Sequence, residues 1–270
     1  MEERVKKEIE YYDKEAEKLF HAEAASAVGE IVDFEGFKPL SLASFRYLYE
    51  LLKTACKNKA VLDWGCGNGV HTIPIAAMGA KKVIGIDLSE KLLELGRLKS
   101  TDMEHKVKFL KMDCEKTDFL ENEFDMIFDG GTFSSIDIKK AFPELVRILK
   151  PDGVLIGIET FGHNPIANFN RALNVRSGKR TAWAAAHILN DEGIELARRY
   201  FAKVKIEYFH LFSWLLIPLV GRFWGEKLFD FVEIFDRQFL KIPFLKKYAF
   251  KVVFEFSQPK KIALNGNSND

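Results

Sequence analysis

VLDWGCGNG, at residues 61–69, is the stretch that decides the fold. It places an acid, Asp63, at the end of an apolar run, followed by Gly65, Gly67 and Gly69 ahead of an amphipathic segment. Glycines at such positions let the backbone turn sharply, and they let a ligand approach without meeting a Cβ atom. The stretch therefore predicts a buried strand, a glycine-rich ligand-binding loop and a helix in succession.

On both sides of this loop, short apolar runs alternate with amphipathic segments. The predicted strands are Ala60–Asp63, Lys82–Asp87, Lys106–Lys111, Phe124–Asp129 and Gly153–Glu159. The predicted helices between them lie near 69–79, 89–100 and 137–149. Strands that alternate with helices at this spacing predict an α/β fold, a doubly wound and mostly parallel sheet with helices on both faces.

The remaining chain predicts additions to this core. Residues 1–56 predict an N-terminal helical lid, with a second helix capped by Ser41. The core would comprise residues 57–211 and 246–258, which include a helix at 184–200 and two last strands at 203–210 and 246–256, making seven strands in all. Residues 212–245 are aromatic and helical in pattern, and they predict a helical cap or insertion before the last strand.

The 270 residues are 47% hydrophobic and 29% charged, with a formal net charge of +1. This composition is typical of a soluble globular protein, and it disfavours nucleic-acid binding through a broad basic surface. The three cysteines are widely spaced and odd in number, so neither a disulfide framework nor a metal site is expected. No signal sequence is visible, and no apolar run reaches the roughly 18 residues of a spanning helix. We therefore expect a cytoplasmic protein without a transmembrane segment.

The acids that end successive strands narrow the class of ligand. A dinucleotide fingerprint requires a third glycine where this chain has Val70, which disfavours a nicotinamide-dependent oxidoreductase. Asp87 ends the second predicted strand about 20 residues beyond the loop, where a carboxylate can accept both ribose hydroxyls. Asp113 ends the third. Because the carboxyl ends of parallel strands share one edge of a sheet, Asp63, Asp87 and Asp113 should border a single ligand.

The pattern D-x-G-x-G-x-G resembles motif I of class I S-adenosylmethionine-dependent methyltransferases. The resemblance runs through residues 60–160 and resumes in the last two strands; it is closest to the group that includes the ubiquinone and menaquinone C-methyltransferases. It implies S-adenosylmethionine as the cofactor and S-adenosylhomocysteine as the product. The cofactor-binding residues that it implies, or that the predicted lid adds, are Tyr12, Asp63, Gly65, Cys66, Gly67, Asp87, Leu88, Asp113, Cys114, Asp129 and Gly130.

The sequence restricts the methyl acceptor only broadly. FDGGTFSS, after the fourth predicted strand, lacks the N/D-P-P-Y/F loop of amino-methyltransferases that act on DNA, so DNA is not expected as a partner. The favoured interpretation is methyl transfer to a small molecule or to a lipid- or glycan-linked acceptor. The alternatives are an RNA or protein methyltransferase and a non-catalytic methyltransferase-like binding protein.

Candidate acceptor-side residues follow the fourth and fifth predicted strands. His163 and His187 are candidates for a general base, while Thr132, Asn164 and Arg171 are candidates for binding the acceptor. His71 is interpreted as a packing or capping residue.

The apolar stripe within 212–247 is open to several interpretations. It could belong to the hydrophobic core, cap the acceptor, contact a membrane surface or form a dimer contact. The expected assembly is accordingly a monomer or a homodimer.

Overall fold

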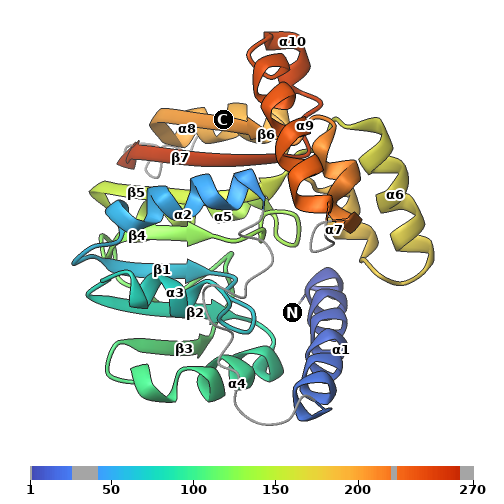
Figure 1. Cartoon of the computed structure of the whole chain (residues 1–270). Helices are drawn as coiled ribbons and strands as arrows, with labels where there is room; N and C mark the ends of the chain where they lie inside the picture. Colours follow the sequence, from blue (N-terminus) through green and yellow to red (C-terminus); the bar gives the residue numbers. More distant parts are fainter. Residues whose placement is uncertain (1, 26–41, 220–223, 262–270) are drawn as a thin grey trace.

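Seven strands form one mixed sheet in the computed structural model, which describes residues 2–25, 42–219 and 224–261. Their order across the sheet is β3-β2-β1-β4-β5-β7-β6 (Figure 1). The strands are β1 Ala60–Trp64, β2 Lys82–Asp87, β3 Val107–Lys111, β4 Phe124–Asp129, β5 Leu149–Thr160, β6 Phe201–Phe209 and β7 Lys251–Pro259. Strands β1 to β5 are parallel to one another, and β7 is antiparallel to both β5 and β6. The predicted doubly wound, mostly parallel sheet is confirmed.

Helices pack on both faces of this sheet. On one face, Phe142 and Leu145 of α5 join the larger hydrophobic core; on the other, Leu48 and Leu52 of α2 join the second. The helices are α1 Glu3–Ala25, α2 Ala43–Ala55, α3 Thr72–Ala77, α4 Glu90–Lys99, α5 Ile138–Ile148, α6 Pro165–Arg176, α7 Ala182–Ala186, α8 Asp191–Tyr200, α9 Gly225–Phe239 and α10 Pro243–Lys246, with short 3₁₀ turns η2 Thr101–Met103 and η3 Ser213–Leu219. No helix in the described parts of the chain is long and apolar enough to cross a membrane.

The structure differs from the sequence expectation mainly after β5. The polar stretch that follows Gly162 contains α6, because the Asn164 side chain accepts hydrogen bonds from Ile166 N and Ala167 N and Pro165 occupies the first turn. The helix expected over 184–200 is two helices, α7 and α8, each with its own side-chain cap. The last strand begins at Lys251, since α10 occupies part of the range expected to be extended. Ser41, the expected cap of the second helix, lies outside the described residues.

Between β6 and β7 the chain leaves the sheet and returns to it. Phe209, the last residue of β6, pairs directly with Lys251, the first residue of β7. Residues 210–250, which contain η3, α9 and α10, therefore start and finish at neighbouring points of the sheet. This is the same edge at which the parallel strands end, so α9 lies on that side of the molecule, as α1 and α6 do (Figure 1).

Candidate active site

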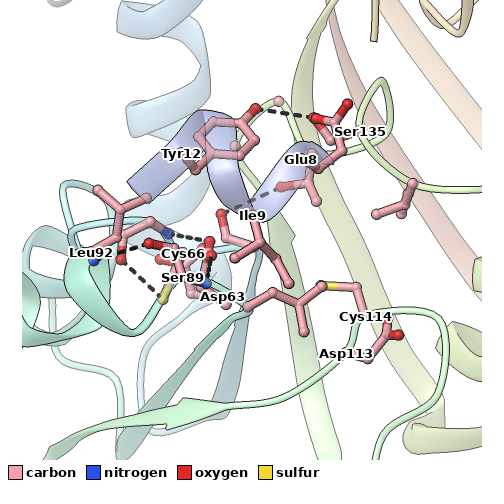
Figure 2. Close-up of a pocket in the computed structure, with 18 of the residues that line it drawn as sticks. Glu8, Ile9, Tyr12, Asp63, Cys66, Ser89, Leu92, Asp113, Cys114 and Ser135 are labelled. Atoms are coloured by element: carbon pink, nitrogen blue, oxygen red, sulfur yellow. Dashed lines mark hydrogen bonds between the residues drawn. The ribbon is translucent and has the colours of Figure 1, made fainter. Parts of the chain in front are cut away.

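A cavity of about 250 Å³ lies at the carboxyl edge of the parallel strands, with α1 as one wall (Figure 2). The residues that follow β1, β2, β3 and β4 each contribute to its lining. The expected cofactor-binding residues that line it are Tyr12, Asp63, Gly65, Cys66, Gly67, Asp87, Leu88, Asp113, Cys114 and Gly130. One sheet edge therefore brings together side chains that are far apart in the sequence.

The glycine loop has a conformation that its residue types require. Gly65 has φ +71°, a value that L side chains rarely adopt, and a Cβ atom there would lie 2.2 Å from Thr132 Oγ1. The same hydroxyl donates a hydrogen bond to the Trp64 carbonyl oxygen at 2.8 Å. Thr132 therefore fastens the loop after β4 to the end of β1 and fills the space that a side chain at position 65 would occupy.

Asp87 lines the cavity and is held by two backbone N–H groups. Its Oδ2 accepts a hydrogen bond from Gly67 N at 2.9 Å, and its Oδ1 accepts one from Ser89 N at 2.9 Å. Burial raises the pKa of this carboxyl, and the backbone N–H groups act in the opposite direction. Each oxygen can accept a further hydrogen bond, because a carboxylate offers about four lone-pair sites.

Asp63 is more deeply buried than Asp87. Its Oδ2 accepts a hydrogen bond from Thr72 Oγ1 at 2.6 Å, which ties the end of β1 to the first residue of α3. Burial raises the Asp63 pKa to about 7, and the Asp87 carboxyl adds to the increase. At neutral pH this group is therefore divided between its protonated and ionised forms.

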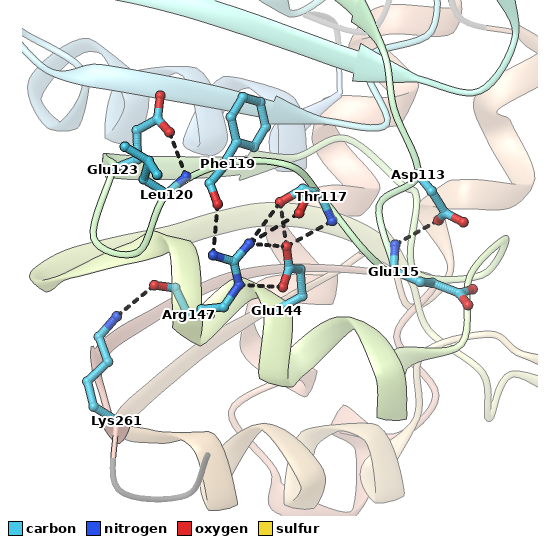
Figure 3. Close-up of polar contacts among 9 residues, drawn as sticks. All are labelled: Asp113, Glu115, Thr117, Phe119, Leu120, Glu123, Glu144, Arg147 and Lys261. Carbon is cyan, nitrogen blue, oxygen red and sulfur yellow. Dashed lines mark hydrogen bonds and ion pairs between the residues drawn. The ribbon is translucent and has the colours of Figure 1, made fainter. Parts of the chain in front are cut away.

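The segment after β3 is held by a polar network behind the cavity (Figure 3). Glu144 of α5 accepts hydrogen bonds from Thr117 N at 2.9 Å and from two guanidinium nitrogens of Arg147. Although burial opposes the effect, these bonds lower the pKa of Glu144. Asp113 Oδ1 in turn accepts a hydrogen bond from Glu115 N at 2.8 Å. The network fixes the backbone that presents Asp113 and Cys114 to the cavity.

Helix α1 closes the cavity from the side opposite the sheet. The Tyr12 hydroxyl lies 3.0 Å from Ser135 Oγ, and Arg4 forms an ion pair with Glu115 (Figure 2 shows the first pair). Glu8 also faces the cavity, and neither of its buried carboxylate oxygens makes a hydrogen bond. Burial raises the pKa of this carboxyl. Glu8 is thus a polar group that the sequence analysis missed, since its position in a charged helix gave no sign that it is buried.

The cavity wall also includes His71. Its ring packs against Phe128 with centroids 5.1 Å apart, and the Tyr49 hydroxyl lies 2.7 Å from His71 Nδ1. A Cβ atom at Gly130 would lie 3.0 Å from His71 Cδ2. Burial lowers the His71 pKa to about 4, so the ring is neutral at pH 7. The packing interpretation therefore describes only part of the environment of His71, which also lines the cavity. Its position just after the glycine loop was the sequence feature that could have indicated this second contact.

The two expected general bases lie elsewhere. His163 is partly exposed, and its Nε2 is 3.3 Å from an Asp191 carboxylate oxygen. His187 stacks on Trp183 with centroids 3.6 Å apart, and its Nδ1 lies 2.9 Å from the Trp183 carbonyl oxygen. Neither histidine lines the cavity. His163 lies between β5 and α6, and His187 ends α7.

Three further expected site residues have structural contacts outside the cavity lining. Asn164 caps α6 and donates a hydrogen bond from Nδ2 to the Tyr248 carbonyl oxygen at 2.9 Å. Arg171 is buried, and it donates to the Phe161 carbonyl oxygen at 3.2 Å. Asp129 is fully buried, and its Oδ1 accepts from Thr132 N at 3.0 Å. Asp129 therefore positions the loop that carries Thr132, which does line the cavity.

Comparison with known proteins agrees with this geometry. Residues 61–153 match the family described as a methyltransferase domain. The chain is 37% identical over 102 residues to demethylmenaquinone methyltransferase from Staphylococcus saprophyticus, a match that covers 37% of this chain and 43% of that protein. The Staphylococcus aureus (strain MRSA252) enzyme is 37% identical over 107 residues, covering 38% and 44%. The chain thus spans less than half the length of the curated relatives that it matches.

Solved structures share the fold. Haemonchus contortus phosphoethanolamine N-methyltransferase 2 aligns with a TM-score of 0.58 and 18% identity, covering 87% of this chain and 61% of that one. Geranyl diphosphate C-methyltransferase from Streptomyces coelicolor aligns with a TM-score of 0.58 and 17% identity, covering 79% and 77%. Residues 61–153 are thus a methyltransferase domain, and the chain shares its fold with methyltransferases solved with S-adenosylhomocysteine. The domain resembles the quinone methyltransferase group.

Proposed function

We propose that this protein transfers the methyl group of S-adenosylmethionine to a small-molecule or lipid-linked acceptor. The single observation that carries the proposal is the cavity in which Asp87, the glycine loop and Cys114 meet at the carboxyl edge of the sheet. The domain match and the demethylmenaquinone methyltransferases among the relatives support a small-molecule or lipid-linked acceptor in particular.

The residues present fit the cofactor. Asp87 has acceptor capacity left over for the ribose hydroxyls after its two backbone hydrogen bonds. Leu88, Ile9 and Cys114 offer an apolar setting for the adenine ring beside Asp113. The turn at Gly65 lines the cavity, and we assign the methionine end of the cofactor to it. When bound, S-adenosylmethionine supplies an electrophilic methyl group on a positively charged sulfur.

The chain's own contribution would be alignment and exclusion of water. We assign α1 the role of a lid, because Tyr12 and Arg4 attach it to the opposite wall through Ser135 and Glu115. We assign the acceptor side to Gly130–Thr132. His71, which a Cβ atom at Gly130 would approach to 3.0 Å, and Glu8 are titratable side chains of the same cavity lining. A neutral His71 can take up a proton if the acceptor loses one.

Isothermal calorimetry with S-adenosylmethionine, S-adenosylhomocysteine and NAD tests the cofactor assignment. We expect the two sulfur ligands to bind and NAD not to bind. Asp87→Ala should weaken binding at least tenfold, consistent with the roughly 1.5–3 kcal/mol of a hydrogen bond to a charged group. Asp102→Ala, at an exposed position on η2, is the matched control and should bind as the wild type does. Absence of binding by either sulfur ligand would refute the proposal.

The acceptor class is tested with a methyl-labelled donor and a cell extract separated into organic-soluble, small water-soluble, protein and RNA fractions. We expect label in the first or second fraction. Label confined to protein or RNA would refute the acceptor part of the proposal and leave the cofactor assignment intact. Binding without label in any fraction would indicate a non-catalytic binding protein.

A further inference from the structure

Helix α9 presents its apolar side chains to solvent. Leu228, Phe231, Phe235 and Phe239 recur at three- and four-residue spacing and lie on one face of the helix. Phe231 is 57% exposed and Phe235 is 48% exposed. A helix that packs on a core normally buries such a stripe. The residues that follow continue the surface, with Ile242 and Phe244 also exposed.

The opposite face of α9 buries two carboxylates. Glu233 is 3% exposed and Asp236 is 0% exposed. Asp236 accepts hydrogen bonds from Phe212 N at 3.0 Å and from Ser213 N at 2.9 Å. Glu233 Oε2 lies 2.8 Å from His210 Nδ1. These contacts fix the helix on its polar face.

His210 also links α9 to the first turn of α2. Its Nε2 lies 2.8 Å from Ser44 Oγ, next to the start of α2, and the imidazole itself is fully buried. Ser44, His210 and Glu233 are hydrogen-bonded in the sequence serine–histidine–carboxylate, as in a nucleophilic triad. All three are buried, however, and His210 has no exposed surface, so no substrate can reach the serine. The cluster is an attachment for α9, and the apolar stripe faces outward as a consequence.

The charges around the exposed stripe are predominantly of one sign. Residues 237–250 contain no Asp or Glu and carry Arg237, Lys241, Lys246 and Lys247. Asp230, an exposed acid of α9, is already paired with Arg46 at 2.9 Å. The exposed surface of α9 and α10 is therefore aromatic, aliphatic and cationic.

Helix α6 adds to this surface. Its Asn164 cap is hydrogen-bonded to the Tyr248 carbonyl oxygen just beyond α10, which places the first turn of α6 against that segment. Ile166, Phe169 and Leu173 of α6 are exposed. Residues 160–190 contain no Asp or Glu. In Figure 1, α6, α9 and α10 lie on the same side of the molecule.

We propose that the exposed apolar and cationic surface of α9, α10 and the start of α6 docks onto an anionic lipid bilayer. An interfacial helix binds lipid with its apolar side chains among the acyl chains and its Lys and Arg side chains at the headgroups. A second copy fits less well. A two-fold interface would set this patch against itself and bring Lys241 and Lys246 toward lysines, with no free carboxylate in 237–250 to pair with them.

Vesicle flotation of the full chain without cofactor tests the docking separately from the proposed methyl transfer. The probes are vesicles of phosphatidylcholine alone and of phosphatidylcholine with 30% phosphatidylglycerol. We expect binding to the anionic vesicles, weaker binding to the neutral ones and a marked decrease in 0.5 M NaCl. Phe231→Glu/Phe235→Glu, at positions already exposed, should bind at least tenfold more weakly.

Leu98→Glu/Leu120→Glu is the matched control, since both leucines are exposed on α4 and on the segment between β3 and β4. It should bind vesicles as the wild type does. The proposal is overturned if the wild-type protein does not bind anionic vesicles, or if both double variants lose binding equally. Analytical ultracentrifugation completes the test: a wild-type dimer that Phe231→Glu/Phe235→Glu converts to a monomer, without vesicle binding, would assign the surface to a second copy instead.

Discussion

Helices α5 and α9 have similar amphipathic spacing and opposite orientations. In α5, Phe142, Leu145 and Val146 are buried against the sheet while Lys139 and Lys140 are exposed. In α9, the equivalent apolar stripe is exposed and the acids are buried. Apolar periodicity therefore identifies a stripe on a helix without determining which way the stripe faces. The direction is decided by what the other face can bind, and α9 has hydrogen-bond partners for two carboxylates.

Replacing one aromatic residue of each helix by alanine tests this comparison, and we expect the largest change in stability here. Phe142→Ala should lower the free energy of unfolding by about 3–5 kcal/mol, since it leaves a cavity in the core. Phe231→Ala should change it by less than about 0.5 kcal/mol, since the side chain is already exposed. Urea unfolding measures both. Equal costs at the two positions would show that α9 packs its stripe against protein.

The attachment of α9 predicts the next largest effect. His210 has φ +63°, so asparagine is the suitable replacement because it tolerates this backbone region. His210→Asn should destabilise the protein by roughly 1.5–3 kcal/mol, because the buried Glu233 carboxylate would lose its contact with the imidazole and keep only the hydrogen bond from the Ser213 hydroxyl. Limited proteolysis should then cut within 212–245 before the rest of the chain. Unchanged stability and an unchanged cleavage pattern would mean that the buried acids do not hold the helix.

The buried acids of the two regions should respond to pH in opposite directions. Burial raises the Asp63 pKa to about 7, so its contribution to stability falls as pH rises from about 4 to 7. Relative to wild type, Asp63→Asn should therefore gain about 1.4 kcal/mol per pH unit over that range. Hydrogen bonds from His210 and Ser213 outweigh burial and lower the Glu233 pKa. Its contribution is present above about pH 4.5 and is lost in acid, so Glu233→Gln should change with the opposite sign. Urea titrations between about pH 2.5 and 8 measure both, because the Glu233 change falls below about pH 4.5 and the Asp63 change falls above about pH 4. Parallel curves would contradict the contrast.

Surface lysines should have the smallest effect on stability. Lys246→Gln/Lys247→Gln should leave the free energy of unfolding within about 0.5 kcal/mol of wild type, since exposed charges contribute little. The same variant should bind anionic vesicles several-fold more weakly, because each lysine near a charged membrane contributes about 1 kcal/mol. Flotation at two salt concentrations separates the effects. A variant that binds as wild type does would assign the attraction to the aromatic side chains alone.

The sequence predicted the parts of the site that depend on local patterns. The glycine loop and Asp87 follow from spacing along consecutive strands, and the cavity lining includes both. His163 and His187 do not line the cavity, and their role as general bases stays a prediction. Their positions could not be read from local pattern, because the path of the chain after β5 depends on the Asn164 cap and on contacts with distant segments. The sequence also could not show that the apolar stripe of α9 faces outward. That orientation depends on Ser44, which lies 166 residues from His210 in the sequence.

The direct pairing of Phe209 with Lys251 has an evolutionary consequence. Strands β6 and β7 would close as an ordinary hairpin if a short turn replaced the whole of residues 210–250, because the ladder between them needs nothing from that segment. A lineage can therefore gain, lose or exchange such a segment without redesigning the catalytic sheet. The surface that we propose for membrane docking and the residues that line the cavity therefore lie on segments that can change separately in evolution.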